Sequence, residues 1–230
     1  DAVVGDNGVA RRLNGKVYEL ISTDPVNVAD GVALQEDTIA TGNGQDVVIG
    51  GNDDDSIKGE EGDDLILADN ARILFFDSEV IGLNSPDHDH YHHDHDDKYF
   101  DPFNVPGIEL LADNIGGNDT VEGGEDNDLI YGQFGNDTYQ FVGGGLGSDR
   151  LIENSSNPLN DSQDVLDFSK FNGSVDIDLD SSKTQTVNDK VSEGDIHLEL
   201  HLYNPLGFEG VIGSEFNDEI QGNNRNNILI

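Results

Sequence analysis

The feature that most constrains this chain is a repeat of nine residues. In three consecutive copies, which begin at Thr41, Gly50 and Gly59, an Asp occupies the sixth place and an aliphatic residue the eighth. A period of nine fits neither a heptad nor the turn of an α-helix. Each copy has a Gly-rich polar half followed by aliphatic residues, which indicates a turn and then a short strand. The sequence therefore predicts a solenoid in which each copy adds one turn and one strand.

The same frame returns along the chain, with a three-residue expansion before Asp149. The residue in the eighth place is predicted to face a core between two sheets. These core positions are Ile39, Val48, Ile57, Ile66, Val121, Ile130 and Tyr139. The acidic residues in the sixth place are Asp37, Asp46, Asp55, Asp64, Asp119, Asp128, Asp137, Asp149 and Asp218, and Asn227 follows nine residues after the last.

The pattern resembles the RTX, or hemolysin-type calcium-binding, family, whose repeat is G-G-x-G-x-D-x-U-x. The clear matches cover roughly half of the chain. The resemblance implies an all-β fold, a right-handed parallel β-roll in which two copies make one coil. It also implies several bound Ca²⁺ ions and a piece of a larger secreted protein.

The charges give their own reason for a cation. If two copies form a coil, Asp46 stacks over Asp64 at one edge and Asp37 over Asp55 at the other. Strands stack about 4.8 Å apart, where two carboxylates repel by roughly 3 kcal/mol at an effective dielectric of about 20. Ca²⁺ accepts six to eight oxygen ligands in loose geometry, whereas Mg²⁺ demands a tight octahedron. The alternative is that these Asp residues only cap turns.

A calcium site is expected to combine a carboxylate from one coil with the Gly-rich turn of the next coil on the same edge. The strongest sites are predicted at Asp46, Asp55, Asp64, Asp119, Asp128 and Asp137. Asp37 lies in a copy without turn glycines, so it is expected to provide a ligand only to the following turn on the same edge. Asp149 and Asp218 each stand at the end of a series of repeat copies. The other candidate ligands, which lie in the turns, are Asp53, Asp126, Gly42, Gly44, Gly51, Gly59, Gly62, Gly117, Gly124, Gly132 and Gly135.

Two segments, at about 9–31 and 72–111, interrupt the frame, and each follows a similar Asp-Asn turn. Insertions of this kind lie on one face of a solenoid, so short hairpins lying on the roll are expected. If the second insertion loops out cleanly, the ion column is continuous; if it splits the roll, Asp55 and Asp64 lack a following turn. The expected domains are a calcium-binding roll over 1–152, a β extension with wider coils over 153–212 and truncated further repeats over 213–230.

The second insertion also carries a His-rich segment. Imidazole is a good ligand for Zn²⁺, Cu²⁺ or Ni²⁺, so this segment is a candidate transition-metal site; the alternative is a solvated charged loop. His197 and His201, further along, are expected to face outward from a strand. The candidate ligands of the His-rich segment are His88, His90, His92, His93 and His95.

The amino-acid composition limits the classes of partner that this chain is expected to bind. The net charge of −37, from 48 acidic and 11 basic residues, argues against nucleic acid and anionic membrane surfaces. No apolar run is long enough to cross a bilayer, and the chain has no Cys for a disulfide. The chain starts at Asp1 and contains no Met, so a processed product or a fragment is expected.

No nucleophile elbow, Cys nucleophile, P-loop or H-E-x-x-H motif occurs, so the chain is not expected to be an enzyme itself. The favoured hypothesis is a calcium-binding structural or interaction module of a secreted or cell-surface protein, which folds on binding Ca²⁺ outside the cell. Its further partners would be other cell-surface or matrix components, or copies of itself. The alternative is an accessory, non-catalytic RTX domain of a secreted protease, lipase or epimerase.

Overall fold

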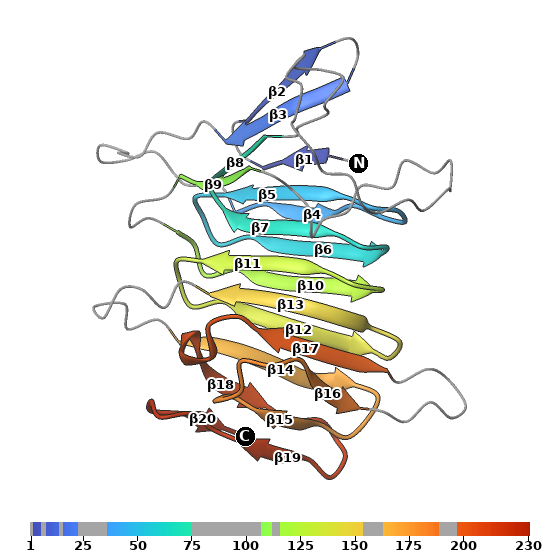
Figure 1. The fold of residues 1–230 in the computed structure, drawn as a ribbon, viewed down its shortest axis with the longest axis vertical. Helices are drawn as coiled ribbons and strands as arrows, with labels where there is room; N and C mark the ends of the chain where they lie inside the picture. The colour runs from blue at the N-terminus through green and yellow to red at the C-terminus, as the bar shows by residue number, and fades with distance from the viewer. Residues whose placement is uncertain are drawn as a thin grey trace, which may run out of the picture.

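The protein is a parallel β-roll built from two facing sheets of seven strands each (Figure 1). The computed structural model describes residues 2–5, 8–13, 16–22, 36–74, 107–111, 116–153, 163–188 and 197–230. Between residues 38 and 171, apart from the insertion strands, successive strands alternate between the two sheets, so that each coil there contributes one strand to each. The predicted all-β roll is therefore confirmed. No helix among the described residues has the length and apolarity needed to cross a membrane.

Strands of the first sheet come from alternate copies of the repeat. In spatial order they are β1 (Ala2–Val4), β5 (Val47–Gly51), β7 (Leu65–Asp69), β11 (Leu129–Gln133), β13 (Gly147–Glu153), β17 (Leu198–Leu202) and β16 (Gln185–Asn188). All neighbours are parallel except β16 and β17.

The second sheet holds the intervening copies, and all its pairings are parallel. Its strands, again in spatial order, are β4 (Thr38–Ala40), β6 (Ser56–Glu61), β10 (Thr120–Glu125), β12 (Thr138–Gly143), β14 (Asp164–Phe171), β18 (Phe208–Ile212) and β20 (Ile228–Leu229). A 3-10 turn, η2 (Pro205–Gly207), precedes β18, and β15 (Asp176–Asp178) pairs with β19 (Glu219–Gln221) in a separate small sheet.

Both sheets continue past the second insertion. Ile57 of β6 pairs with Val121 of β10, and β7 pairs with β11 in the same way. Asp69 closes the base of the insertion: its Oδ1 accepts the backbone N–H of Gly117 at 2.9 Å and its Oδ2 accepts that of Phe134 at 2.9 Å. The insertion therefore loops out of one continuous roll.

The described parts of the two insertions form one antiparallel sheet rather than separate hairpins. Its order is β2 (Gly8–Leu13), β3 (Lys16–Ser22), β8 (Ala71–Leu74) and β9 (Ile108–Leu110), at the N-terminal end of the roll in Figure 1. Buried Glu19 accepts hydrogen bonds from Arg11 at 2.6 Å and Arg72 at 2.7 Å. This ion pair joins the first insertion to the second.

Two apolar cores stabilise the structure. The inner core lies between the two sheets and contains all seven predicted eighth-place residues, each 7% exposed or less. The outer core was not predicted: it packs Val47, Ile49, Leu65, Leu67 and Leu129 of the first sheet against Leu20, Ala71 and Ile73 of the insertion sheet. In the second sheet the equivalent outward places carry polar residues such as Ser56 and Lys58. The insertion sheet therefore covers the one sheet that has an apolar outer face.

Candidate metal centres

The sixth-place aspartates form a column along one edge of the roll. The backbone N–H of Asp46 donates to Oδ1 of Asp64 at 2.8 Å, and that of Asp64 donates to Oδ1 of Asp128 at 3.0 Å. Asp128 in turn donates to Oδ1 of Asp149 at 3.0 Å. Each carboxylate therefore holds the turn of the preceding coil in register.

A second column runs along the opposite edge and crosses the second insertion without a break. Its backbone N–H donors bond to side-chain oxygens of the next coil over distances of 2.7–3.0 Å. In order, the column is Asp37, Asp55, Asp119, Asp137, Asp164 and Glu209.

These carboxylates are removed from water, and only one oxygen of each takes part in the ladder. The six strongest predicted positions are all 3% exposed or less. In the described part of the chain, the Oδ2 atoms of Asp64, Asp119, Asp128 and Asp137 have no hydrogen-bond partner. A buried polar atom left in this state costs about 1–3 kcal/mol, and more if it is charged. A ligand that binds the second oxygen of each carboxylate would remove this cost.

The space beside these oxygens is lined by more oxygen. A Cβ atom at Gly59 would collide with Oδ2 of Asp64 and with the carbonyl oxygen of Gly123, which lies one coil further along. A Cβ at Gly123 would collide with Oδ2 of Asp128. A set of carboxylate and backbone carbonyl oxygens is the donor set that Ca²⁺ prefers. The residues present therefore fit a calcium ion between successive turns.

Most of the predicted turn glycines lie directly against a backbone carbonyl oxygen of a neighbouring coil. A Cβ at Gly62 would collide with the carbonyl oxygen of Gly44, one at Gly117 with that of Asp53, one at Gly135 with that of Gly117, and one at Gly147 with that of Asp126. Gly124 faces the carbonyl of Glu60, and Gly132 faces side chains of Asp137, Tyr139 and Glu153. Gly42, Gly44 and Gly51 take positive φ angles of 90°, 121° and 151°.

Burial strongly disfavours the charged form of these carboxyls. It raises the pKa of Asp64 to about 7 and that of Asp119 to about 8. The pKa of Asp137 rises to about 11, first through burial and then through the charge of Glu153. Burial also raises the pKa of Asp128 and of Asp149 well above the usual range. A cation would offset the penalty by stabilising the ionised forms.

Asp37 and Asp218 differ from the other predicted carboxylates. A Cβ at Gly5 would approach Oδ2 of Asp37 and the carbonyl oxygen of Gly50. Gly5, which precedes the first insertion in the sequence, therefore lies beside Asp37 in the position that a turn glycine occupies beside the other column carboxylates. Asp218 is half-buried and precedes β19 of the small separate sheet. Its Oδ1 accepts the backbone N–H of Val175 at 2.8 Å, as the column carboxylates accept from the preceding coil, and the side chain also accepts hydrogen bonds from Ser214, as a turn cap does. The His-rich segment with His88, His90, His92, His93 and His95 lies outside the described residues.

Besides Glu19 of the insertion sheet, sequence reasoning missed four buried carboxylates in the roll: Asp69, Glu153, Asp164 and Glu209. A signal existed for two of them. Asp164 lies 27 residues after Asp137, a multiple of nine, and Glu209 lies 45 residues after Asp164. Each is followed two residues later by a buried aliphatic side chain, Leu166 or Val211. The second column of carboxylates thus continues beyond the second run of repeats, into the expected β extension.

Comparison with known proteins agrees with these columns. The sequence model for the RTX calcium-binding nonapeptide repeat matches in four copies, over residues 35–70, 115–151 and 212–230. The extracellular lipase LipA from Serratia marcescens is similar at 15% identity and a TM-score of 0.17, over 74% of this chain and 38% of the lipase chain. No curated protein matches the chain. The matched ranges include the six strongest predicted carboxylates, and the chain therefore carries RTX calcium-binding nonapeptide repeats in both runs of the roll and at its C-terminal end.

Proposed function

We propose that this chain is a calcium-dependent structural or interaction module of a secreted or cell-surface protein, and that it folds when Ca²⁺ binds outside the cell. One observation carries the proposal. Two columns of buried carboxylates run the length of the repeats, and in the described part of the chain several second oxygens, such as Oδ2 of Asp64 and Asp128, have no hydrogen-bond partner. The repeats are the part of the chain that the family model matches.

The ligands are proposed to be Asp46, Asp55, Asp64, Asp119, Asp128 and Asp137, together with carbonyl oxygens of the glycine turns. Extracellular calcium modules bind at about 10⁻⁴–10⁻³ M. At ten times that dissociation constant each site adds about 1.4 kcal/mol, so sites at all six carboxylates add about 8 kcal/mol. That total is comparable to the stability of a whole domain, about 5–15 kcal/mol. Calcium binding can therefore decide whether the roll is folded.

Low calcium has the opposite effect. A net charge of −37 repels compaction, and the columns bring the carboxylates of successive coils together. The chain is expected to stay unfolded at the low calcium of a cytosol and to fold in millimolar calcium. This behaviour suits a protein that is exported before it folds and then presents a rigid roll to surface or matrix components, or to copies of itself.

Far-UV circular dichroism tests the proposal. In excess chelator the spectrum should be that of a largely disordered chain, and titration to millimolar Ca²⁺ should restore a β spectrum cooperatively. Mg²⁺ at the same concentration should not do so, because it keeps its water shell and requires octahedral geometry. Equal β signal and equal melting temperature in chelator and in Ca²⁺ would reject the proposal.

A further inference from the structure

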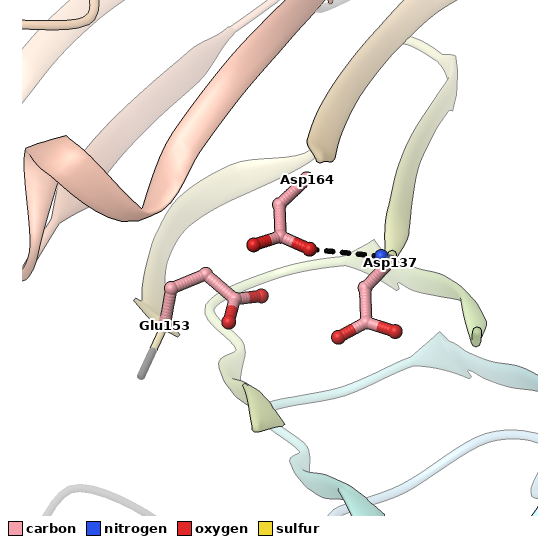
Figure 2. A group of neighbouring side chains, drawn as sticks. All are labelled: Asp137, Glu153 and Asp164. Carbon is pink, nitrogen blue, oxygen red and sulfur yellow. Dashed lines mark hydrogen bonds between the residues drawn. The ribbon is translucent and has the colours of Figure 1, made fainter. Parts of the chain in front are cut away.

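A group of three buried carboxylates contains two consecutive members of the second column, Asp137 and Asp164, together with Glu153 (Figure 2). Asp137 immediately precedes β12, Glu153 ends β13 and Asp164 begins β14. One oxygen from each lies within 4.8 Å of the others, and the three residues are 1%, 2% and 2% exposed. Glu153 and Asp164 both lie outside the residues that match the repeat model.

Glu153 departs from the repeat in a way that alters this site. It stands two residues after the eighth-place Leu151, where most earlier copies have Gly or Ala, such as Gly59 and Gly132, although the copies of Ile39 and Tyr139 have Thr41 and Phe141. A Cβ at Gly132 would collide with Oε1 of Glu153 and would lie 2.8 Å from Oδ2 of Asp137. At Gly59 the equivalent space faces a backbone carbonyl oxygen instead. The Glu153 carboxylate thus takes the position of a neutral ligand in the repeat sites.

Tyr139 is a second departure at the same place. It occupies an eighth place that is aliphatic in the neighbouring copies, and it is fully buried with its ring 5.7 Å from that of Phe208. Its hydroxyl donates a hydrogen bond to Oε1 of Glu153. The phenol therefore fixes the carboxylate that replaces the carbonyl, and the two departures support each other.

One oxygen in the group has no partner. Oδ1 of Asp137 accepts the backbone N–H of Asp119 at 2.8 Å, and Asp137 donates its own N–H to Oδ1 of Asp164 at 2.9 Å. Oδ2 of Asp137 is buried and has no hydrogen-bond partner in the described part of the chain. In Figure 2 the three carboxylates point toward a common space. Two ligands of one calcium ion, each at about 2.3–2.6 Å, lie up to about 5 Å apart, so one ion can bind all three.

We propose that Asp137, Glu153 and Asp164 form a further calcium site, with more ligand charge than the repeat sites, which fastens β14 to the end of the repeat roll. Ligand charge tunes calcium affinity. This site is therefore the first to fill as calcium rises and the last to empty. A trivalent lanthanide matches the charge of three carboxylates and binds there more tightly still. The site goes beyond the proposed function, because the repeat sites can bind calcium without it.

Tb³⁺ luminescence tests the site in the full chain. The Tyr139 hydroxyl bonds to Glu153, so excitation of tyrosine should sensitise a Tb³⁺ ion held there. The wild-type chain should show one tight sensitised site from which excess Ca²⁺ displaces the Tb³⁺. Glu153→Gln should weaken that site at least tenfold, whereas the control Glu219→Gln, on the exposed side of β19, should not. Tyr139→Phe should lower the sensitised emission from this tight site, because Tyr139 is the tyrosine bonded to Glu153, but should keep the calcium-dependent β spectrum.

The outcomes separate this proposal from the function above. If Glu153→Gln and Glu219→Gln bind Tb³⁺ alike, or if Tyr139→Phe leaves the emission from the tight site unchanged, the proposal is overturned. A tightest calcium site that is unchanged in Glu153→Gln, together with a raised melting temperature, would mean that the carboxylates share protons instead of a cation. Should Glu153→Gln fail to fold, Asp164→Asn and Tyr139→Phe carry the same comparison. A wild-type chain that gains no β signal in Ca²⁺ would reject the proposed function, whatever these variants show.

Discussion

Replacement of Asp119 by Asn should have opposite effects on stability with and without calcium. Oδ1 of Asp119 accepts the backbone N–H of Asp55 at 2.7 Å, and the amide oxygen of Asn can keep this bond. Oδ2 has no hydrogen-bond partner among the described residues, and the side chain is 1% exposed. The substitution therefore keeps the shape and the ladder while it removes one buried charge.

The size of the effect without calcium follows from the raised pKa. Burial raises the pKa of Asp119 to about 8, so the folded chain must take up a proton at pH 7 that the unfolded chain does not hold. With an unfolded pKa of about 3.9, this uptake costs up to about 4 kcal/mol at pH 7. Asn avoids that cost. In chelator the variant should therefore be more stable than the wild type by up to about 4 kcal/mol.

With calcium the sign reverses, because Asn offers a neutral ligand in place of a carboxylate. Loss of one site at ten times its dissociation constant removes about 1.4 kcal/mol. The assay is urea unfolding in millimolar Ca²⁺ and folding induced by trimethylamine oxide in chelator, since this osmolyte favours burial. Asp176→Asn, on the exposed side of β15, is the control and should change neither value. A variant that is destabilised in both conditions, or in neither, would refute the reasoning.

Three other predictions concern the core, the turn and the pH dependence. Ile57→Asp should lower the melting temperature in Ca²⁺ by an amount that corresponds to several kcal/mol, because Ile57 is 0% exposed and an unpaired charge would be buried; a melting temperature within a degree or two of the wild type would show that Ile57 is not core. Gly59→Ala should weaken calcium binding about tenfold or more in a titration, since the Cβ would collide with Oδ2 of Asp64 and fill the ion space; unchanged affinity would mean that no ion lies there. In chelator, the stability measured with trimethylamine oxide should be highest below about pH 4 and should fall as pH rises through about 7 and 8, the pKa values to which Asp64 and Asp119 are raised. The reason is that between the unfolded and the folded pKa values the folded chain binds more protons than the unfolded chain. Stability that rises with pH over this range would contradict the assignment.

The nine-residue frame was enough to predict the inner core and the edges of the roll. Period and residue type placed Ile57 between the sheets and Asp55 and Asp64 at the turns, and the fold confirms the core. Continuity past the second insertion could not be predicted. It depends on the closure of the insertion base by Asp69, whose two backbone donors lie 48 and 65 residues away. Contacts at that separation leave no local pattern.

The outer core and the three-carboxylate group were missed for different reasons. Aliphatic residues flank Val48 and Ile66, whereas polar residues flank Ile57, and this alternation is visible in the sequence. What covers the apolar face is an antiparallel sheet from two distant insertions, which no local pattern specifies. Glu153 escaped notice because it replaces a glycine in its copy of the repeat, so that it breaks the very frame used to find sites.

The most direct test of the whole account is a diffraction experiment on crystals grown in Ca²⁺, with anomalous scattering used to locate the ions. We expect calcium peaks along both edges of the roll, beside Oδ2 of Asp64, Asp119 and Asp128, each with oxygen ligands at about 2.3–2.6 Å. Peaks confined to exposed carboxylates, with none between the coils of either column, would contradict it.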